Sequence, residues 1–436
     1  MRIAYITAGA AGMFCGSCLH DNTLAAALLA LGHDAVLVPT YTPILTDEKD
    51  VSLHRVFFSG INVYLQQKFS LFRHTPWSLD RLFAVPALLR WVAGFGMEIE
   101  AHKLGALTVS MLKGEHGNQR KEVEKLAAWL AENLRPQVVN LTNVLLSGLV
   151  HEVKRRLPGV PVLGTLQGDD VFLEGLTEPY RSQALGLIRD HCREMDGFIA
   201  TSAYYADFMA EYLAIPRDRI HVILPGLNLA GHGGERPPRA GPPVVGYFAR
   251  ICPEKGLHVL AEAFRLLRQT PGAPACRLRV SGWLGEGGRR YYDEIERKLK
   301  EAGLGADFER VESPDHNSKV RFFQGIDVLS VPTTYREPKG LYVLEALANG
   351  VPVVQPGHGS FPELIEATGG GLLVRPDDPA DLARGLRQLL ENDAHRAELG
   401  RKGKEAVWRH FHAERMARAT AQVYGQYTAA RAAAAS

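Results

Sequence analysis

Short apolar runs alternate with segments of helical periodicity along most of this chain. The series opens with an apolar run at residues 2–6, a helical segment at 19–31 and a second apolar run at 35–39. A strand, a helix and a strand in this order form a βαβ unit, and successive units build a parallel sheet with helices on its faces. The alternation therefore predicts an α/β fold with parallel sheets.

The alternation forms two series with one break between them. Residues 231–243 read GHGGERPPRAGPP, and a polar stretch so rich in glycine and proline is typical of a linker. We predict two Rossmann-like domains at residues 1–230 and 241–408, followed by a C-terminal helix and tail at 409–436. Two such halves are expected to face a cleft, with ligands at the carboxyl ends of the strands.

The two series predict the individual elements. In the first half, strands are expected at 2–6, 35–39, 51–58, 61–65, 137–140, 160–163, 197–200 and 220–224, and helices at 19–31, 122–134, 145–156, 181–194 and 203–213. In the second half, strands are expected at 244–248, 277–280, 308–311, 328–331 and 351–354, and helices at 257–267, 291–300, 341–348 and 379–390.

An aromatic-rich stretch at about residues 66–114 interrupts the first series. It contains Trp77 and Trp91 and is broken by Pro76 and Pro86. We interpret it as a helical insertion whose aromatic side chains pack in a core, and a peripheral membrane contact remains an alternative.

Composition excludes several classes of protein. Lys plus Arg total 50 and Asp plus Glu total 48, so the net charge of +2 gives no electrostatic reason to expect a nucleic-acid partner. Five cysteines in 436 residues do not suggest a disulfide framework, and they favour a reducing compartment. No apolar run is long enough to span a membrane. We therefore expect a cytoplasmic protein.

Two glutamates flank a predicted helix start in the second half. Residues 333–354 read TTYREPKGLYVLEALANGVPVV, with Glu337 in a loop and Glu345 about one turn into the helix that begins near Gly340. Free N–H groups at a helix start form a site for an anion. We predict that the two carboxylates bind sugar and ribose hydroxyls on either side of a phosphate. Two solvated surface charges are the alternative.

Two cations follow the first strand of the second half. Residues 244–264 read VVGYFARICPEKGLHVLAEAF, which places Arg250 at the strand end and Lys255 before Gly256. Arg offers a planar, bidentate contact and Lys a mobile point charge, a pair suited to a diphosphate. For this segment alone, two exposed cations near a turn are the alternative.

In this order and separation, the two segments resemble the retaining glycosyltransferases of family four, which have the GT-B fold. The sequence GRKGKEAVWRHFHAERMARATAQVY is similar to the family's last helices, the final one of which crosses back to the first domain. LALGHDAVLV is similar to the family's usual start, and INVYLQQKFSLFR resembles the glycogen and starch synthase branch. The resemblance implies sugar transfer from a UDP-, GDP- or ADP-linked donor to a carbohydrate or other hydroxyl acceptor. It further implies retention of the anomeric configuration and no metal or other cofactor.

The resemblance also implies roles for single residues. Arg250, Lys255 and Glu337 are the expected catalytic residues: the two cations bind the donor diphosphate, and Glu337 sits at the donor sugar near the reacting centre. Gly340 and Leu341 are expected to offer backbone N–H groups to phosphate. Fixed positive charge and N–H donors suit the negative charge that grows on a diphosphate leaving group.

The remaining substrate-binding expectations follow from the same resemblance. Glu345 is expected to bind the ribose. Gln167 occupies a place where the family often has histidine, and an amide there can hydrogen-bond a hydroxyl or a carbonyl. Gly16 holds part of the place of a glycine pair in the first loop, so it is expected to contact substrate. Lys339 replaces a common aromatic residue and adds a cation beside the phosphates.

Metal and redox sites are not expected. Cys15 and Cys18 form a CxxC at a loop–helix junction, where a redox pair is the alternative to simple packing. No second CxxC completes a zinc site, and we interpret Asp169-Asp170 and Asp377-Asp378 as ordinary loop carboxylates.

Two other functions stay open. One is different chemistry on a nucleotide sugar by a GT-B enzyme, such as epimerisation or hydrolysis. The other is a non-catalytic protein that binds a nucleotide or a sugar. Measuring donor hydrolysis with and without an acceptor distinguishes other nucleotide-sugar chemistry from sugar transfer. Binding without turnover would indicate a non-catalytic protein.

Overall fold

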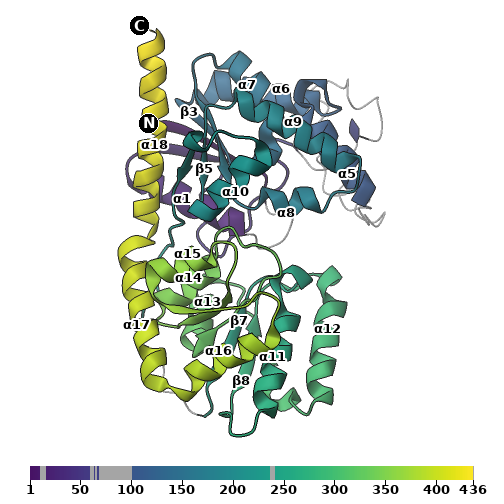
Figure 1. Ribbon diagram of the computed structural model, residues 1–436. Helices are drawn as coiled ribbons and strands as arrows, with labels where there is room; N and C mark the ends of the chain where they lie inside the picture. The colour runs from purple at the N-terminus through teal and green to yellow at the C-terminus, as the bar shows by residue number, and fades with distance from the viewer. Residues whose placement is uncertain (10–15, 59–62, 64–65, 68–100, 236–240, 436) are drawn as a thin grey trace. The chain divides into compact units, whose positions relative to one another are not determined.

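The structure is a computed structural model (Figure 1). It divides into two compact units, each with its own sheet. Unit 1 comprises Met1–Thr201, Tyr205–Ile223 and Ala417–Ser436, and unit 2 comprises Ser202–Tyr204 and Leu224–Met416. The structure describes residues 1–9, 16–58, 63, 66–67, 101–235 and 241–435.

Unit 1 is built on a six-stranded sheet in which every neighbouring pair of strands is parallel. Its order is β2-β1-β3-β4-β5-β6. The central strands are almost wholly buried, as expected where helices cover both faces of a parallel sheet. The strands are β1 (Arg2–Thr7), β2 (Asp34–Pro39), β3 (Val138–Leu141), β4 (Val162–Leu166), β5 (Gly197–Ala200) and β6 (Ile220–Val222).

The helices of unit 1 follow the strands along the chain. The α-helices are α1 (Gly16–Ala30), α5 (Ala101–Leu112), α6 (Arg120–Trp129), α7 (Val150–Arg156), α8 (Asp169–Glu174), α9 (Tyr180–Glu194) and α10 (Ala203–Leu213). Shorter helical turns are η2 (Gly114–His116), η3 (Leu130–Leu134), η4 (Val144–Leu149) and η5 (Arg217–Arg219).

Unit 2 repeats this architecture with a second parallel six-stranded sheet, in the order β12-β11-β10-β7-β8-β9. Its strands are β7 (Val244–Phe248), β8 (Arg277–Ser281), β9 (Phe308–Arg310), β10 (Val328–Leu329), β11 (Val353–Pro356) and β12 (Gly371–Val374). Its helices are η6 (Pro253–Lys255), α11 (Leu257–Gln269), α12 (Glu286–Glu301), η7 (Gly305–Asp307), α13 (His316–Gln324), α14 (Leu341–Ala348), α15 (Phe361–Thr368), α16 (Pro379–Glu391) and α17 (Asp393–His410).

Each sheet has a point where its strand order reverses. In unit 1 the chain passes from β1 to β2 on one side and then resumes with β3 on the other side of β1. In unit 2 it runs outward from β7 through β8 to β9 and then resumes with β10 on the other side of β7. Ligands bind in such sheets at the carboxyl ends of the strands beside the reversal. The residues after β1 and β3, and after β7 and β10, are therefore the first places to look for a site.

The last helix, α18 (Ala413–Ala435), returns to unit 1, to which its residues from Ala417 onward belong. Its Tyr427 hydroxyl lies 3.0 Å from Nε2 of His221 on β6. Gly197 allows this approach, because a Cβ there would come within 2.2 Å of the Tyr427 hydroxyl. The expected return of the final helix is confirmed.

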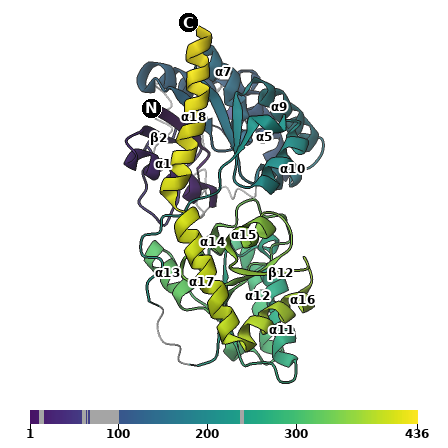
Figure 2. The same ribbon diagram turned by 60° about the vertical axis from the view of Figure 1, so that its left-hand side comes forward.

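Helices of unit 2 also pack closely through glycine. Figure 2 shows α17 beside α14. A Cβ at Gly400 on α17 would lie 2.2 Å from the carbonyl oxygen of Gly350, two residues after the end of α14. The backbones approach at this point because Gly400 carries no side chain.

One predicted strand is wrong. Residues 51–58 form only an isolated bridge, between Ser52 and Leu37, instead of a strand. Phe57 and Phe58 are both buried, whereas consecutive side chains of a strand point to opposite faces. The expected strand at 61–65 falls almost entirely outside the described residues, as does most of the insertion expected at 66–114, of which α5 is described.

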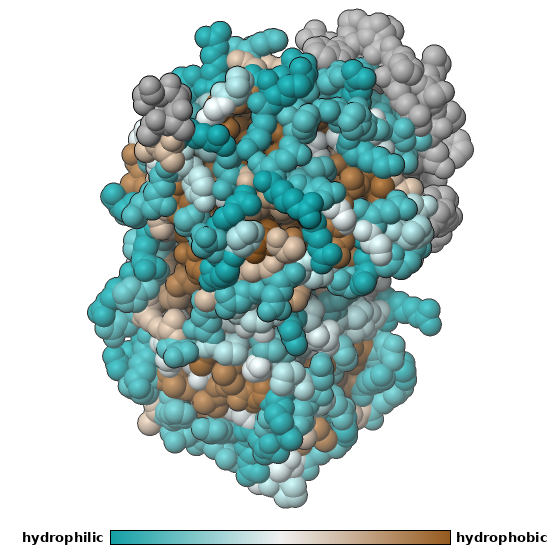
Figure 3. All heavy atoms as spheres, turned by 45° about the horizontal axis from the view of Figure 1, so that its top comes forward, coloured by the Kyte–Doolittle hydropathy of each residue, from teal (hydrophilic) through white to brown (hydrophobic). Residues whose placement is uncertain are grey.

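Exposed apolar side chains are scattered over the described surface. On the face drawn in Figure 3, hydrophobic residues form separate areas among hydrophilic ones. Such scattering is ordinary for a protein surface. Within the described part of the chain, no helix combines the length and apolar character that a membrane span requires. The large exposed apolar residues are Leu29, Val171, Val222, Trp283, Leu373 and Trp408.

Candidate active site

A lysine and a glutamate meet beside the reversal point of unit 2. Lys255 ends η6 after β7, and Glu337 lies in the loop after β10. The Lys255 ammonium lies 2.6 Å from Oε2 of Glu337. Their side chains are 16% and 6% exposed, so this ion pair is mostly shielded from water. Two residues 82 positions apart in sequence thus form one polar centre.

Two tyrosines complete this centre. The Tyr335 hydroxyl accepts from Lys255 at 2.5 Å and donates to Oε2 of Glu337 at 2.7 Å. The Tyr342 hydroxyl donates to the same oxygen at 3.2 Å. The Lys255 ammonium also lies 4.9 Å and 5.2 Å from the ring centres of Tyr335 and Tyr342, within the range of a cation–π contact.

The centre fixes the charge of Glu337. Burial raises the pKa of this carboxyl, but the Lys255 charge and hydrogen bonds from Lys255 and Tyr335 outweigh burial and lower the pKa to about 2. Burial, reinforced by the Glu337 charge, raises the pKa of Tyr335 and of Tyr342 well above the ordinary value. At neutral pH the centre therefore holds a carboxylate and two neutral phenols.

Backbone contacts hold the two loops of the centre together. The Thr334 N–H donates to the Glu254 carbonyl at 3.0 Å. Gly256 has a φ of +72°, and a Cβ there would come within 1.8 Å of the Pro332 carbonyl oxygen. Gly256 is therefore needed both for its backbone conformation and for the close contact between the loops.

The start of α14 faces Glu337. Gly340 precedes the helix with a φ of +65°. The N–H groups of Lys339 and Gly340 lie 3.3 Å and 3.4 Å from Oε1 of Glu337, which is long for a hydrogen bond. Leu341 is the first residue of α14 and is buried. Of the two N–H groups expected to bind phosphate, that of Gly340 thus lies at the same centre as Glu337.

Arg250 lies just after β7 and is exposed to solvent. Its carbonyl accepts from the Tyr247 hydroxyl at 3.2 Å, which fixes the backbone at the strand end. The Cys252 thiol lies 3.7 Å from the same carbonyl. Arg250 thus shares the loop after β7 with Lys255, the other cation predicted from the sequence.

Glu345 forms a second ion pair. Its Oε1 lies 2.6 Å from the ammonium of Lys319 on α13, and both side chains are 5% exposed. Sequence reasoning missed Lys319, because it did not predict α13. The signal was present: Asp315 and Ser318 form a capping box at the start of α13, ahead of the buried residues Val320, Phe322 and Phe323.

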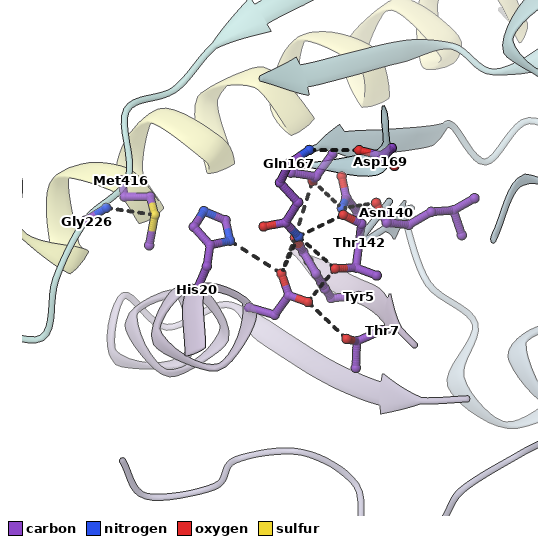
Figure 4. A network of polar contacts seen from close by, with 12 residues as sticks. Tyr5, Thr7, His20, Asn140, Thr142, Gln167, Asp169, Gly226 and Met416 are labelled. Atoms are coloured by element: carbon purple, nitrogen blue, oxygen red, sulfur yellow. Dashed lines mark hydrogen bonds and ion pairs between the residues drawn. The ribbon is translucent and has the colours of Figure 1, made fainter. Parts of the chain in front are cut away.

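Unit 1 contains a polar network beside its own reversal point (Figure 4). Asp21 on α1 is fully buried and accepts from the Tyr5 and Thr7 hydroxyls, both at 3.0 Å. It also accepts from the Thr142 hydroxyl and, at 3.1 Å, from Nε2 of Gln167. These donors follow or lie on β1, β3 and β4. Asp21 was not singled out from the sequence, because its donors come from distant segments.

The partners of Gln167 fix the direction of its amide. Its Nε2 donates to the Asp21 carboxylate and, at 2.8 Å, to the Thr142 carbonyl. Carboxylates and carbonyls accept but do not donate, so the amide nitrogen must face them. The Gln167 carbonyl oxygen is consequently the atom turned away from the Asp21 network, as Figure 4 shows.

Asp169 begins α8 and is buried, in contrast to an ordinary loop carboxylate. It accepts from the N–H groups of Val144 at 2.7 Å and Gln167 at 3.0 Å. Burial is the main cause of its raised pKa of about 6. Asp377 lies before α16, whose cap is Asp378, the residue that accepts from the Asp381 N–H.

The other expected residues are placed as follows. Gly16 is the first residue of α1 and belongs, with Gln167, to unit 1, whereas the other expected site residues belong to unit 2. Cys18 is buried on α1, and Cys15 lies outside the described residues. Among the described residues, no group of three or more His, Cys, Asp or Glu could hold a metal ion.

Comparison with known sequences matches both halves of the chain. Residues 22–226 match the family described as "Glycosyl transferase 4-like domain", and residues 235–406 match "Glycosyl transferases group 1". A D-inositol 3-phosphate glycosyltransferase of Nocardia farcinica is 33% identical over 223 residues, 49% of this chain and 48% of that protein. A glycogen synthase of Mycobacterium tuberculosis is 30% identical over 239 residues, 53% of this chain and 54% of that protein. The chain spans about half the length of these two relatives.

Solved structures share the fold. A sucrose-phosphate synthase of Thermosynechococcus elongatus superposes with a TM-score of 0.73 at 21% identity, over 99% of this chain and 100% of that one. HepE of Anabaena, solved in complex with UDP, superposes with a TM-score of 0.69 at 16% identity, over 98% of this chain and 100% of that one. At these identities the likeness concerns the fold.

Proposed function

This chain belongs to the family-four glycosyltransferases with the GT-B fold, and from that premise we propose that it transfers a sugar from a nucleotide-diphosphate sugar to a hydroxyl acceptor. The observation that carries the proposal is the Lys255–Glu337 centre at the reversal point of unit 2. The proposal includes retention of the anomeric configuration, as expected for this family.

The charges at this centre suit departure of a nucleoside diphosphate. Lys255 has three N–H donors, two of which serve Tyr335 and Glu337, so the third can point at a phosphate oxygen. Arg250 and the N–H groups at the start of α14 add positive charge and donors. Because these groups are fixed before reaction, they stabilise the charge that develops on the leaving diphosphate. We propose that this charge set makes the reaction independent of added metal.

The two glutamates would act differently. We assign Glu337 to the donor sugar, where a carboxylate binds more strongly as positive charge develops on the ring. We assign Glu345 to the ribose, which does not change during the reaction. Loss of Glu337 should therefore mainly lower kcat, and loss of Glu345 should mainly raise the donor KM.

We assign the donor to unit 2 and the acceptor to unit 1. The names of the relatives refer to D-inositol 3-phosphate and to glycogen. Lys339, 6% exposed and next to the Glu337 centre, adds a cation that suits a phosphate group. Inositol phosphate and glycogen are accordingly the acceptors to compare first.

The experiment is a transfer assay with UDP-, GDP- and ADP-linked hexoses, with and without each acceptor. We expect product only when an acceptor is present, and we expect the reaction to continue when EDTA is added. The product should have the same anomeric configuration as the donor, as measured by NMR. Glu337→Gln should lower kcat about a hundredfold, and Glu345→Gln should raise the donor KM about tenfold. Glu296→Gln, which removes one partner of a surface ion pair on α12, is the matched control. Donor hydrolysis without transfer, or binding without turnover, would contradict the proposal.

A further inference from the structure

We propose that Lys319 is a positioning residue for the nucleotide: its ion pair fixes the Glu345 carboxylate in the direction that the ribose hydroxyls require. The inference deepens the proposed function and rests on the assignment of Glu345 to the ribose. Lys319 acts through Glu345 and need not touch the nucleotide itself.

The first support is the geometry of the pair. Lys319 comes from α13 and Glu345 from α14, so the 2.6 Å contact between Nζ and Oε1 joins two helices. A carboxylate on a flexible side chain can rotate freely in water, whereas this one is held by a charged partner at 5% exposure. The bound oxygen sets the direction of the other oxygen, because the carboxylate is planar.

The second support is that both ends of the pair have a fixed backbone. The Asp315 side chain accepts from the Ser318 N–H at 2.8 Å, which anchors the first turn of α13 next to Lys319. On the other helix, the Glu345 carbonyl accepts from Nδ2 of Asn349 at 2.9 Å. Lys319 thus lies within one turn of the start of α13, and Glu345 lies within one turn of the end of α14.

The third support is energetic. A buried ion pair is a poor way to stabilise a fold, because the cost of removing both charges from water offsets most of their attraction. Well-packed apolar side chains would serve stability as well. Glu345 lies four residues after Leu341, about one turn from the start of α14. A costly charge pair on the helix whose start faces Glu337 is better explained by ligand positioning than by stability.

The test measures ribose preference rather than activity. The probe is whichever of UDP, GDP and ADP binds the unmodified protein most tightly, compared by calorimetry with its 2′,3′-dideoxy form. Lys319→Met should weaken binding of the ribonucleotide about tenfold and leave binding of the dideoxy form unchanged. Glu345→Gln should do the same, and the double variant should be no weaker than either single variant.

Controls separate positioning from a general loss of structure. Lys300→Met removes a lysine that pairs with Glu296 at 2.8 Å on the surface, and it should change neither affinity. If Lys319→Met does not fold by circular dichroism, Lys319→Met/Glu345→Leu replaces it, since removing both charges leaves none unpaired. That variant should bind both nucleotide forms equally.

The outcomes are distinct. Equal weakening of both nucleotide forms by Lys319→Met, or a ribose preference that survives in the double variant, would overturn the role of Lys319. If none of the three nucleotides binds the unmodified protein, the proposed function itself fails before Lys319 is tested.

Discussion

At the residue scale, the partners of Gln167 determine what it can bind. Asp21 and the Thr142 carbonyl hold its amide nitrogen, so the group it presents elsewhere is a carbonyl oxygen. A carbonyl oxygen binds a hydroxyl or another donor and cannot transfer a proton. The residue therefore fits a sugar hydroxyl better than a phosphate or an acid–base role.

Substitution of Gln167 tests this orientation. Gln167→Glu would set a second carboxylate against buried Asp21, so it should lower the melting temperature and the rate together, with a cost of about 1–3 kcal/mol. Gln167→His can still donate to Asp21 and should keep substantial activity, whereas Gln167→Ala should lower the rate moderately. Melting curves and initial rates measure these effects. A Gln167→Glu variant as stable as the unmodified protein at pH 7 would contradict the assigned orientation.

The low pKa of Glu337 predicts a pH dependence of stability. Its folded-state pKa of about 2 lies below the ordinary value of 4.5, so the charged form stabilises the fold. This contribution, about 3 kcal/mol, is fully present above pH 4.5 and is lost as the pH falls toward 2. The free energy of unfolding of the unmodified protein, minus that of Glu337→Gln, should therefore shrink from pH 5 to pH 3. A difference that stays constant over this range would show that Lys255 does not hold the carboxylate charged.

Single residues differ in how far the sequence can predict them. Arg250, Lys255, Glu337 and Glu345 stand in two local segments, so a motif is enough to select them. Lys319 was missed because its partner lies 26 positions away on another helix, and nothing local marks the contact. Contacts between side chains that are distant in sequence form only in the packed fold, so a local motif does not reveal them.

At the element scale, segments with a clear apolar pattern and clear ends were predicted well. The boundaries expected for α10, α14 and β7 agree with the structure, because each has a clear apolar pattern and clear ends. Helices α13 and α15 and strand β12 were missed, although α13 and α15 are as long as α14 or longer. The segment at 51–58 was misassigned because its apolar composition favours a strand while its two adjacent buried phenylalanines do not.

The cap of α13 allows a test at this scale. Asp315→Ala removes the bond to the Ser318 N–H and should cost about 1 kcal/mol of stability. Because α13 carries Lys319, we also expect weaker nucleotide binding. Asp378→Ala is the matched control: it removes the same kind of bond, to the Asp381 N–H at 2.9 Å, from α16. Both variants should lose similar stability in urea titrations, and only Asp315→Ala should lose nucleotide affinity. If Asp315→Ala and Asp378→Ala lost nucleotide affinity equally, α13 would have no specific role in nucleotide binding.

At the scale of the whole molecule, the same architecture occurs twice with different chemistry at each reversal point. Unit 1 places a buried carboxylate among hydroxyl and amide donors there, centred on Asp21. Unit 2 places Lys255 and Arg250 beside Glu337. The two parallel sheets were predictable from the alternation of strands and helices. The motifs of unit 2 were enough to select Lys255 and Glu337, which meet in the structure. The Asp21 contacts of unit 1 could not be selected in this way, because their residues come from β1, β3 and β4 and the segments that follow them.

This difference predicts where a nucleotide protects the chain. A diphosphate is drawn to cations and to the start of a helix, which the described part of unit 2 gathers after β7 and β10. In hydrogen–deuterium exchange, a saturating nucleotide should therefore slow amides mainly in residues 250–256 and 334–345, with little change at 140–144 and 165–170. Lys255→Ala should abolish this protection at the same nucleotide concentration, whereas Lys300→Met should retain it. If protection were instead centred on the Asp21 network, the donor would bind to unit 1. The assignment of the donor to unit 2 and the acceptor to unit 1 would then be wrong.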